Sequence, residues 1–170
     1  TSSLVGSEMC IRDRYGGAKE NRTIDRKNYY NYPEIYKMLS ELQPQAIIFS
    51  DGGPGCRWVG NEKGFAGATN WSFLRTGEVF PGYEKYRTLQ YGHADGDQWV
   101  AAECDVSIRP GWFYHPEEDN QVKNVDQLTD LYYRSVGHNA TLLLNFPVDR
   151  NGLIHPIDSA NAVNLSLIHI

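Results

Sequence analysis

The feature that most constrains the fold is a short apolar run that ends in an acidic, glycine-rich turn. Residues 46–49 (AIIF) are apolar throughout and are followed at once by 50–54 (SDGGP). A strand without polar alternation, bounded by turn residues, is typical of a parallel sheet that is covered on both faces. Upstream, Pro33–Leu42 carries an apolar stripe at i, i+4 and i+7 and predicts an amphipathic helix. Helix, buried strand and glycine-rich loop in this order predict an α/β fold.

Two further strands and a second helix follow along the chain. Trp99–Arg109 (WVAAECDVSIR) and Thr141–Phe146 (TLLLNF) have strand character. Asn124–Gly137 has a helical stripe, with Asn124 or Asp126 near the cap and Gly137 as the predicted stop. Cys56–Val100 shows little periodicity and is interpreted as a long connection. These units predict part of a (β/α)8-type barrel. A doubly wound sheet is the structural competitor, but the sequence has no glycine-rich phosphate loop of the required form.

Composition excludes several classes of function. The chain is 41% hydrophobic and 22% charged, with a formal net charge of −5 and no basic stripe, which argues against a nucleic-acid partner. No apolar run approaches the roughly 20 residues that a membrane span needs. The three cysteines form no CxxC pair and no metal-ligand spacing, so we expect no metal and no cofactor. The 11 Tyr, 4 Trp and 6 Phe favour a sugar ligand, although packing explains most of them.

Both ends of the chain have the character of foreign sequence. Residues 1–14 (TSSLVGSEMCIRDR) show neither a helical stripe nor strand alternation and resemble translated sequencing-adapter read-through. The final LSLIHI, residues 165–170, resembles the same artefact. We therefore expect one domain over residues 15–164, flanked by two non-native segments.

Two carboxylates have surroundings that suit catalysis. Asp51 directly follows a predicted strand, which is where a barrel places its catalytic residues; a turn-forming Asx residue is the competing interpretation. Glu103 lies among apolar residues, which raise the pKa of a carboxyl group as an acid catalyst requires. An ion pair between Glu103 and Arg109 is the alternative. Glycoside hydrolysis commonly uses two such carboxyl groups on either side of the scissile bond.

Long segments of the chain resemble one enzyme family. Residues 43–64 (QPQAIIFSDGGPGCRWVGNEKG) and 99–115 (WVAAECDVSIRPGWFYH) are similar to signature segments of glycoside hydrolase family 29, the α-L-fucosidases. The similarity is greatest to the branch that acts on α-1,3/1,4-linked fucose, and it extends over RTIDRKNYYNY upstream and GHNATLLLNFPVDRNGLIHP downstream. The resemblance implies the C-terminal half of a catalytic barrel that lacks its N-terminal strands. It also implies a fucosylated oligosaccharide or glycoconjugate as substrate.

The same resemblance assigns roles to individual residues. It implies that Asp51 is the nucleophile and Glu103 the acid/base of a retaining enzyme, with Asp105 as a neighbouring alternative to Glu103. For Trp58 and Trp112, plain packing is the competing interpretation. The residues implied to contact the sugar are Trp58, Asn61, Glu62, Arg109, Trp112 and His115.

One part of the family pattern is missing. The histidines of this chain do not form the His-His motif that the family carries in its N-terminal half, so the fucose pocket would be incomplete. We therefore expect the full-length parent enzyme to be active and the 170-residue chain to be inactive. We also expect the parent to be periplasmic or secreted. The alternatives are a non-catalytic carbohydrate-binding α/β domain, a barrel glycosidase with another linkage specificity, and an assembly product without an independent role.

Overall fold

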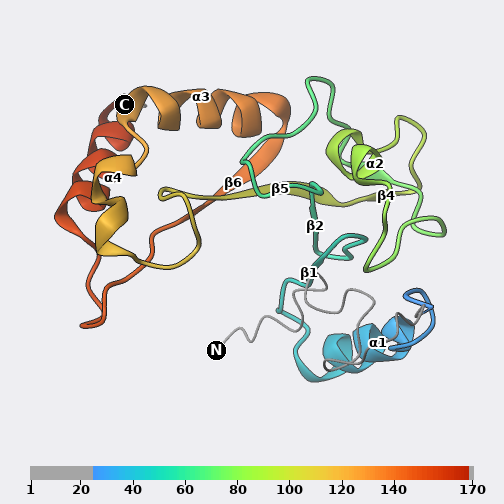
Figure 1. Ribbon diagram of the computed structural model, residues 1–170. Helices are drawn as coiled ribbons and strands as arrows, with labels where there is room; N and C mark the ends of the chain where they lie inside the picture. Colours follow the sequence, from blue (N-terminus) through green and yellow to red (C-terminus); the bar gives the residue numbers. More distant parts are fainter. Residues whose placement is uncertain (1–24, 169–170) are drawn as a thin grey trace, which may run out of the picture.

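The computed structural model describes residues 25–168. The predicted segment 1–14 lies outside these residues, as do positions 169–170 of the predicted tail. Figure 1 shows the helices and strands in sequence colours. Their order is α1 (Tyr32–Leu42), β1 (Phe49–Ser50), β2 (Cys56–Trp58), β3 (Phe73–Leu74), α2 (Tyr86–Tyr91), β4 (Gln98–Trp99), β5 (Ala101–Ser107), η2 (Pro116–Gln121), α3 (Val125–Ser135), η3 (Val136–His138), β6 (Ala140–Asn145) and α4 (Pro156–Ile168).

The centre of the fold is a four-stranded sheet in the order β1-β2-β5-β6, in which every neighbouring pair is parallel. Helices α3 and α4 lie together on one side of β5 and β6 (Figure 1). The predicted α/β class is therefore confirmed. Strand β2 was not predicted, because its three residues are too short to show alternation within the segment interpreted as a connection.

The predicted strand Trp99–Arg109 is two elements. Trp99 belongs to β4, which pairs with β3 in a separate antiparallel ribbon, and β5 begins at Ala101. Between them Val100 is fully buried and its N–H donates to the Ser72 carbonyl at 2.7 Å. The apolar continuity of the sequence concealed this change of sheet, because Trp99 is as apolar as the buried Val100 and Ala102 although its own side chain is exposed.

The two faces of strand β5 differ in how deeply their side chains are buried. Ala102, Cys104 and Val106 are buried, whereas Glu103 and Asp105 between them are only partly buried. Successive side chains of a strand point to opposite faces, so the acidic residues share one face. The other face forms the core with α3 and β6, in a cluster built around Val106, Ile108, Leu128 and Leu131 with Leu142 and Leu144 packed against it.

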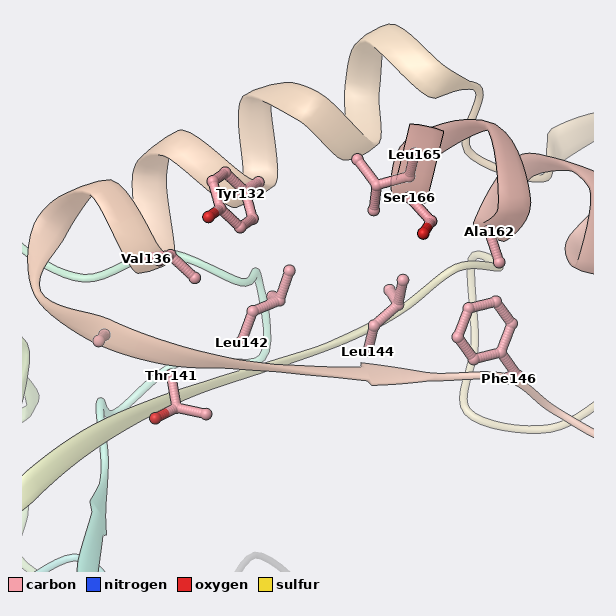
Figure 2. A pocket seen from close by; sticks show the side chains of 10 residues that line it. Tyr132, Val136, Thr141, Leu142, Leu144, Phe146, Ala162, Leu165 and Ser166 are labelled. Atoms are coloured by element: carbon pink, nitrogen blue, oxygen red, sulfur yellow. The ribbon is translucent and has the colours of Figure 1, made fainter. Parts of the chain in front are cut away.

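An apolar groove of about 640 Å³ lies on the helix-covered face, between α3, β6 and α4. Figure 2 shows Leu142 and Leu144 directed into it, while Thr141 points away from it. Because Thr141 is the register partner of Glu103, the groove and the acidic residues lie on opposite faces of the sheet. Leu165, in the segment predicted to be non-native, lines this groove and packs against the core. That the segment is non-native stays a prediction.

Helix α3 begins where the sequence indicates. Asn124 is its N-cap: the Asn124 side chain accepts from the Gln127 N–H at 3.0 Å, and the Gln127 side chain accepts from the Asn124 N–H at 2.9 Å. The predicted stop at Gly137 was wrong. The helix ends at Ser135, a short 3-10 turn follows, and Asn139 with φ of 58° makes the left-handed turn into β6.

The N-terminal side of the sheet is open. The prediction of a strand over 46–49 buried on both faces was wrong: only Phe49 and Ser50 pair, Ile47 is 79% exposed and Phe49 is 44% exposed. Helix α1 follows the prediction in position but buries none of its residues. The physical reason is that β1 is an edge strand, which within the described chain has β2 as its one neighbour.

Replacing Ile47 with lysine tests this open edge. A charge beside an unpaired strand blocks edge-to-edge association, so we expect Ile47→Lys to reduce self-association in sedimentation velocity. Its stability should change by no more than about 0.5 kcal/mol, since the side chain is largely exposed. Leu153→Lys, in the turn between β6 and α4 and 64% exposed, is the matched control. Equal reductions by both variants would show that the edge has no special role.

Candidate active site

Parallel pairing between β2 and β5 brings four functional side chains to one face. Trp58 is the register partner of Glu103, and its indole Nε1–H donates to Asp105 Oδ1 at 2.7 Å. Two residues earlier on β2, the Cys56 Sγ lies 3.7 Å from Glu103 Oε2. The sheet thus places two carboxylates side by side, each against a donor from the neighbouring strand.

The surroundings of Glu103 favour the protonated form of its carboxyl group. Burial raises the pKa of its carboxyl group above the ordinary value, and the hydrogen bond from Cys56 acts in the opposite direction. The alternative of an ion pair between Glu103 and Arg109 is wrong, because Arg109 pairs with Asp119 and Asp158 instead. Glu103 therefore keeps a proton more readily than a surface glutamate does.

Asp105 is more strongly perturbed. Burial raises the pKa of its carboxyl group to about 6, the negative charges of Glu62 and Glu103 add to the rise, and the Trp58 N–H opposes it. Raised carboxyl pKa values on one open face are a common property of functional sites. Asp105 is thus a second candidate acid beside Glu103.

Asp51 lies at the carboxyl end of β1, as predicted. It is only 4% exposed, and its Oδ2 accepts from the Gly82 N–H at 2.6 Å. The turn that carries it is bonded by the Ser50 hydroxyl, which donates to the Gly53 carbonyl at 2.7 Å and accepts from the Gly52 N–H. Asp51 is therefore held between its own turn and the loop at Gly82, at the strand end where a barrel places catalytic groups.

The predicted sugar-contacting tryptophans both bond to carboxylates. Trp112 Nε1–H donates to Glu62 Oε2 at 2.9 Å, so these two predicted residues meet, and the Trp112 carbonyl accepts from Asn145. Asn61 instead bonds within its own loop, to the Phe65 carbonyl and the Lys63 N–H. With their polar ends satisfied, Trp58 and Trp112 are held in fixed orientations.

Arg109 and His115 do not join this group. Arg109 is fully buried: it makes a bidentate pair with Asp158 at 2.8 and 2.9 Å, lies 2.9 Å from Asp119 and stacks over the Tyr114 ring. These contacts tie the end of β5 to the first turn of α4. The His115 side chain is exposed, and its carbonyl accepts from Arg109. A direct contact of either residue with a sugar stays an untested prediction.

Cys56 is the residue of this face that sequence reasoning missed. Its position two residues before Trp58 would have placed both on one face, had β2 been recognised as a strand. Within the described residues there is no group of three or more His, Cys, Asp or Glu suited to a metal ion. Among the same residues, no helix combines the length and apolarity of a membrane span.

Comparison with known proteins places this fold and face in context. α-L-Fucosidase 1 of Arabidopsis thaliana is 46% identical over 147 residues, which are 84% of this chain and 27% of that protein. A crystal structure of a glycoside hydrolase family 29 member from an unknown rumen bacterium matches 91% of this chain and 28% of its own, with 49% identity and a TM-score of 0.79. A Ruminococcus gnavus family 29 fucosidase in complex with fucose matches 91% of this chain and 32% of its own, with 28% identity and a TM-score of 0.70. No protein-family model matches the chain.

These similarities define the parallel sheet as part of a (β/α)8 barrel of the glycoside hydrolase class, which confirms the predicted partial barrel. The chain belongs to glycoside hydrolase family 29, the α-L-fucosidases. It spans less than a third of the length of each of these three relatives.

The raised pKa of Asp105 predicts a pH-dependent stability. Its folded pKa of about 6 exceeds the unfolded value near 3.8. The protonated form of Asp105 therefore leaves the fold at full stability below pH 3.8, and the free energy of unfolding falls as the pH rises through 6. Asp105→Asn keeps an acceptor for Trp58 and removes the charge. At pH 7 we expect it to be more stable than wild type by about 1–2 kcal/mol, allowing for partial solvent screening, and to be equal near pH 3.5.

Urea unfolding across this pH range measures the effect. Asp149→Asn is a control of opposite sign, because the N–H groups of Leu153 and Asn151 hold the pKa of Asp149 below its ordinary value. It should lose stability at pH 7 and less at pH 3. An Asp105→Asn chain less stable than wild type at pH 7 would contradict the burial argument.

The buried pair between Arg109 and Asp158 predicts a large stability effect. Asp158→Ala leaves a fully buried guanidinium without its bidentate partner, so we expect a loss of about 3–5 kcal/mol in urea unfolding. Asp130→Ala removes the partner of Arg134 in an exposed pair on α3 and should cost little. Losses of similar size in the two variants would refute the anchoring role of Arg109.

Proposed function

We propose that this chain is the part of a retaining exo-α-L-fucosidase that carries its two catalytic carboxylates, with Asp51 as nucleophile and Glu103 as acid/base. The observation that supports this most strongly is the placement of the acids. Asp51 lies buried at the carboxyl end of β1, and Glu103 lies on the open face of β5 in the same parallel sheet. Two of the apolar core clusters lie on the helix-covered face, whereas the carboxyl groups of Glu103 and Asp105 are only partly buried on the other face.

The reaction proposed is a double displacement. The Asp51 carboxylate attacks the anomeric carbon of fucose, and Glu103 transfers its proton to the departing glycosidic oxygen as that bond breaks. Glu103, now ionised, takes a proton from water, whose oxygen attacks the same carbon and releases Asp51. The raised pKa of Glu103 favours the protonated form that the first step requires.

For the substrate we propose terminal fucose in α-1,3 or α-1,4 linkage on a glycan. The Ruminococcus gnavus relative has been solved with fucose, which supports a fucosylated ligand. Beyond the fucose, Trp58, Trp112 and Glu62 offer indole faces and a carboxylate for the adjoining sugar. The hydrogen bonds from Trp58 to Asp105 and from Trp112 to Glu62 hold these side chains in place before a ligand arrives, which lowers the entropic cost of binding.

We further propose that the 170-residue chain does not hydrolyse fucosides by itself. Leu143, the register partner of Asp105, is 49% exposed on the acidic face, and β1 is open along its outer edge. A barrel encloses this face with its remaining strands, which would complete the pocket and exclude water. The expected result is no release of 4-nitrophenol from its α-L-fucoside by this chain.

A chimera tests the catalytic roles directly. Residues 25–164 would replace the matching segment of the rumen bacterial family 29 member, which is 49% identical. We expect the chimera to hydrolyse 4-nitrophenyl α-L-fucoside and Asp51→Asn to reduce kcat/KM by about a thousandfold or more. Glu103→Gln should impair hydrolysis of a fucosylated trisaccharide far more than that of the aryl fucoside, whose good leaving group needs little protonation.

Asp105→Asn is the matched control, since it changes a carboxylate two residues away on the same face. It should leave the preference between aryl and glycan substrates unchanged. The reverse pattern would assign the acid/base role to Asp105. Near-normal rates for both Asp51→Asn and Glu103→Gln would favour a non-catalytic carbohydrate-binding domain, and turnover of other aryl glycosides would indicate a different linkage specificity.

A further inference from the structure

We propose that Gly82 is a positioning residue for Asp51: a β-turn over residues 80–83 presents the Gly82 N–H to the Asp51 carboxylate and fixes the direction of that group. The proposal rests on the proposed role of Asp51 as nucleophile. It adds a backbone donor, from the connection between β2 and β5, that neither the sequence pattern nor the similarity to other fucosidases assigns.

The contact is a short hydrogen bond to a charged group. The Gly82 N–H donates to Asp51 Oδ2 at 2.6 Å, and Asp51 is only 4% exposed. Hydrogen bonds to an ionised acceptor are shorter and stronger than neutral ones, and exclusion of water strengthens them further. A carboxylate that must reach one carbon atom along one direction gains from such a bond, because a small rotation of the group would displace the attacking oxygen.

The turn that carries Gly82 is of type II. The Tyr83 N–H donates to the Phe80 carbonyl at 3.1 Å. Pro81 occupies the first central position, and Gly82, with φ of 83°, occupies the second. Proline keeps φ negative at the first position, and a positive φ at the second is the property of a type II turn. Pro81-Gly82 therefore encodes this turn, because glycine adopts a positive φ without steric cost.

The type of the turn decides which atom faces Asp51. Types I and II differ mainly by a flip of the peptide group between their two central residues. In the type II turn that peptide directs the Gly82 N–H at the carboxylate. In a type I turn the peptide would be turned over, and the Pro81 carbonyl oxygen would face and repel the negative charge. The positive φ of Gly82 therefore determines whether Asp51 meets a donor or an acceptor.

Packing holds the turn in place on both sides. Val79 and Tyr83, which flank it, are buried in one core cluster. On the other side the backbone at 79–80 lies close to Gly52, where a Cβ atom would meet the Val79 carbonyl oxygen at 3.0 Å. The turn with Asp51 and the turn with Gly82 are thus packed backbone against backbone. Close packing of this kind leaves little freedom for the distance between them to vary.

The bond affects both steps of the proposed reaction. In the first step Asp51 forms a C–O bond to the anomeric carbon, and the glycosidic oxygen leaves with the bonding electrons and a proton from the acid catalyst. In the second step water gives a proton to the same catalyst and bonds to that carbon, the ester C–O bond breaks, and its electron pair returns to the Asp51 carboxylate. The fixed donor aligns the carboxylate for the first step and stabilises the charge that returns in the second.

Two substitutions separate the type of the turn from the added side chain. Gly82→Ala and Gly82→Asn add the same Cβ atom, whose nearest neighbour is the Arg26 side chain at 3.2 Å. Asparagine tolerates a positive φ, whereas alanine favours a negative φ and hence the type I turn. Gly152→Ala is the control for backbone strain. Gly152 also has a positive φ, of 79°, but no described atom beyond its chain neighbours lies within 4 Å of an added Cβ.

The amide proton of residue 82 reports the bond without turnover. In ¹⁵N-resolved NMR of the chain, we expect this proton far downfield in wild type and in Gly82→Asn, and Asp51→Asn should move it upfield in both backgrounds. In Gly82→Ala it should already lie upfield and respond little to Asp51→Asn. A residue-82 amide proton that is unaffected by Asp51→Asn in the wild-type background would overturn the proposal.

The same variants in an active chimera give a second measurement. Gly82→Ala should lower kcat by about tenfold or more with a smaller change in KM, since the nucleophile loses a charge-assisted hydrogen bond. Gly82→Asn should keep most of the activity, and Gly152→Ala should keep the wild-type kcat. Equal kcat values in Gly82→Ala and Gly82→Asn would overturn the positioning role. Near-normal rates for Asp51→Asn would instead overturn the proposed function, while the response of the amide proton would stand.

Discussion

The parallel pairing of β2 with β5 is the constraint on which the rest of this structure depends. Its register places Trp58 opposite Glu103. Because successive side chains of β5 point to opposite faces, the acidic side chains lie on one face and the core side chains on the other. A shift of one residue would bury Glu103 under α3 and expose Cys104. The buried residues Ala102, Cys104 and Val106 permit a single register. The core on one face therefore determines which side chains lie on the other face.

The acidic face reduces stability, and the other end of the same strand compensates for it. Burial holds the pKa values of Glu103 and Asp105 above their ordinary values, which means that their ionised forms weaken the fold at neutral pH. Just beyond the strand, Arg109 pairs with Asp158 in full burial and links β5 to α4. Natural proteins commonly accept such local costs at functional sites and offset them elsewhere.

Much of this arrangement could be predicted from the sequence. The α/β class follows from the apolar runs, and the start of α3 follows from the polar residues Asn124 and Asp126, of which the structure selects Asn124 as the cap. Strand β2 escaped prediction because three residues carry no periodicity, and with it went the pairing of Cys56 and Trp58 to the two acids. The prediction that the AIIF run is buried was wrong. The sequence pattern shows only that these residues are apolar, whereas their burial depends on a neighbouring strand that the described chain does not supply.

Arg109 shows a different limit of sequence reasoning. A lone arginine after a strand is compatible with substrate binding or with an internal ion pair, and the choice depends on Asp119 and Asp158, which lie 10 and 49 residues further along the chain. Local pattern has no access to such partners. The raised pKa of Glu103 is easier to predict, because its immediate neighbours in sequence already create the apolar setting that causes it.

The nucleophile is the central claim of this account, and trapping the covalent intermediate tests it most directly. A 2-deoxy-2-fluoro-fucosyl fluoride slows the second displacement and accumulates the glycosyl-enzyme ester. Incubated with the active chimera, digested and mapped by mass spectrometry, it should label the peptide that contains Asp51 and nothing in Asp51→Asn. A sugar ester on Glu103 or Asp105, or full turnover by Asp51→Asn, would contradict the assignment.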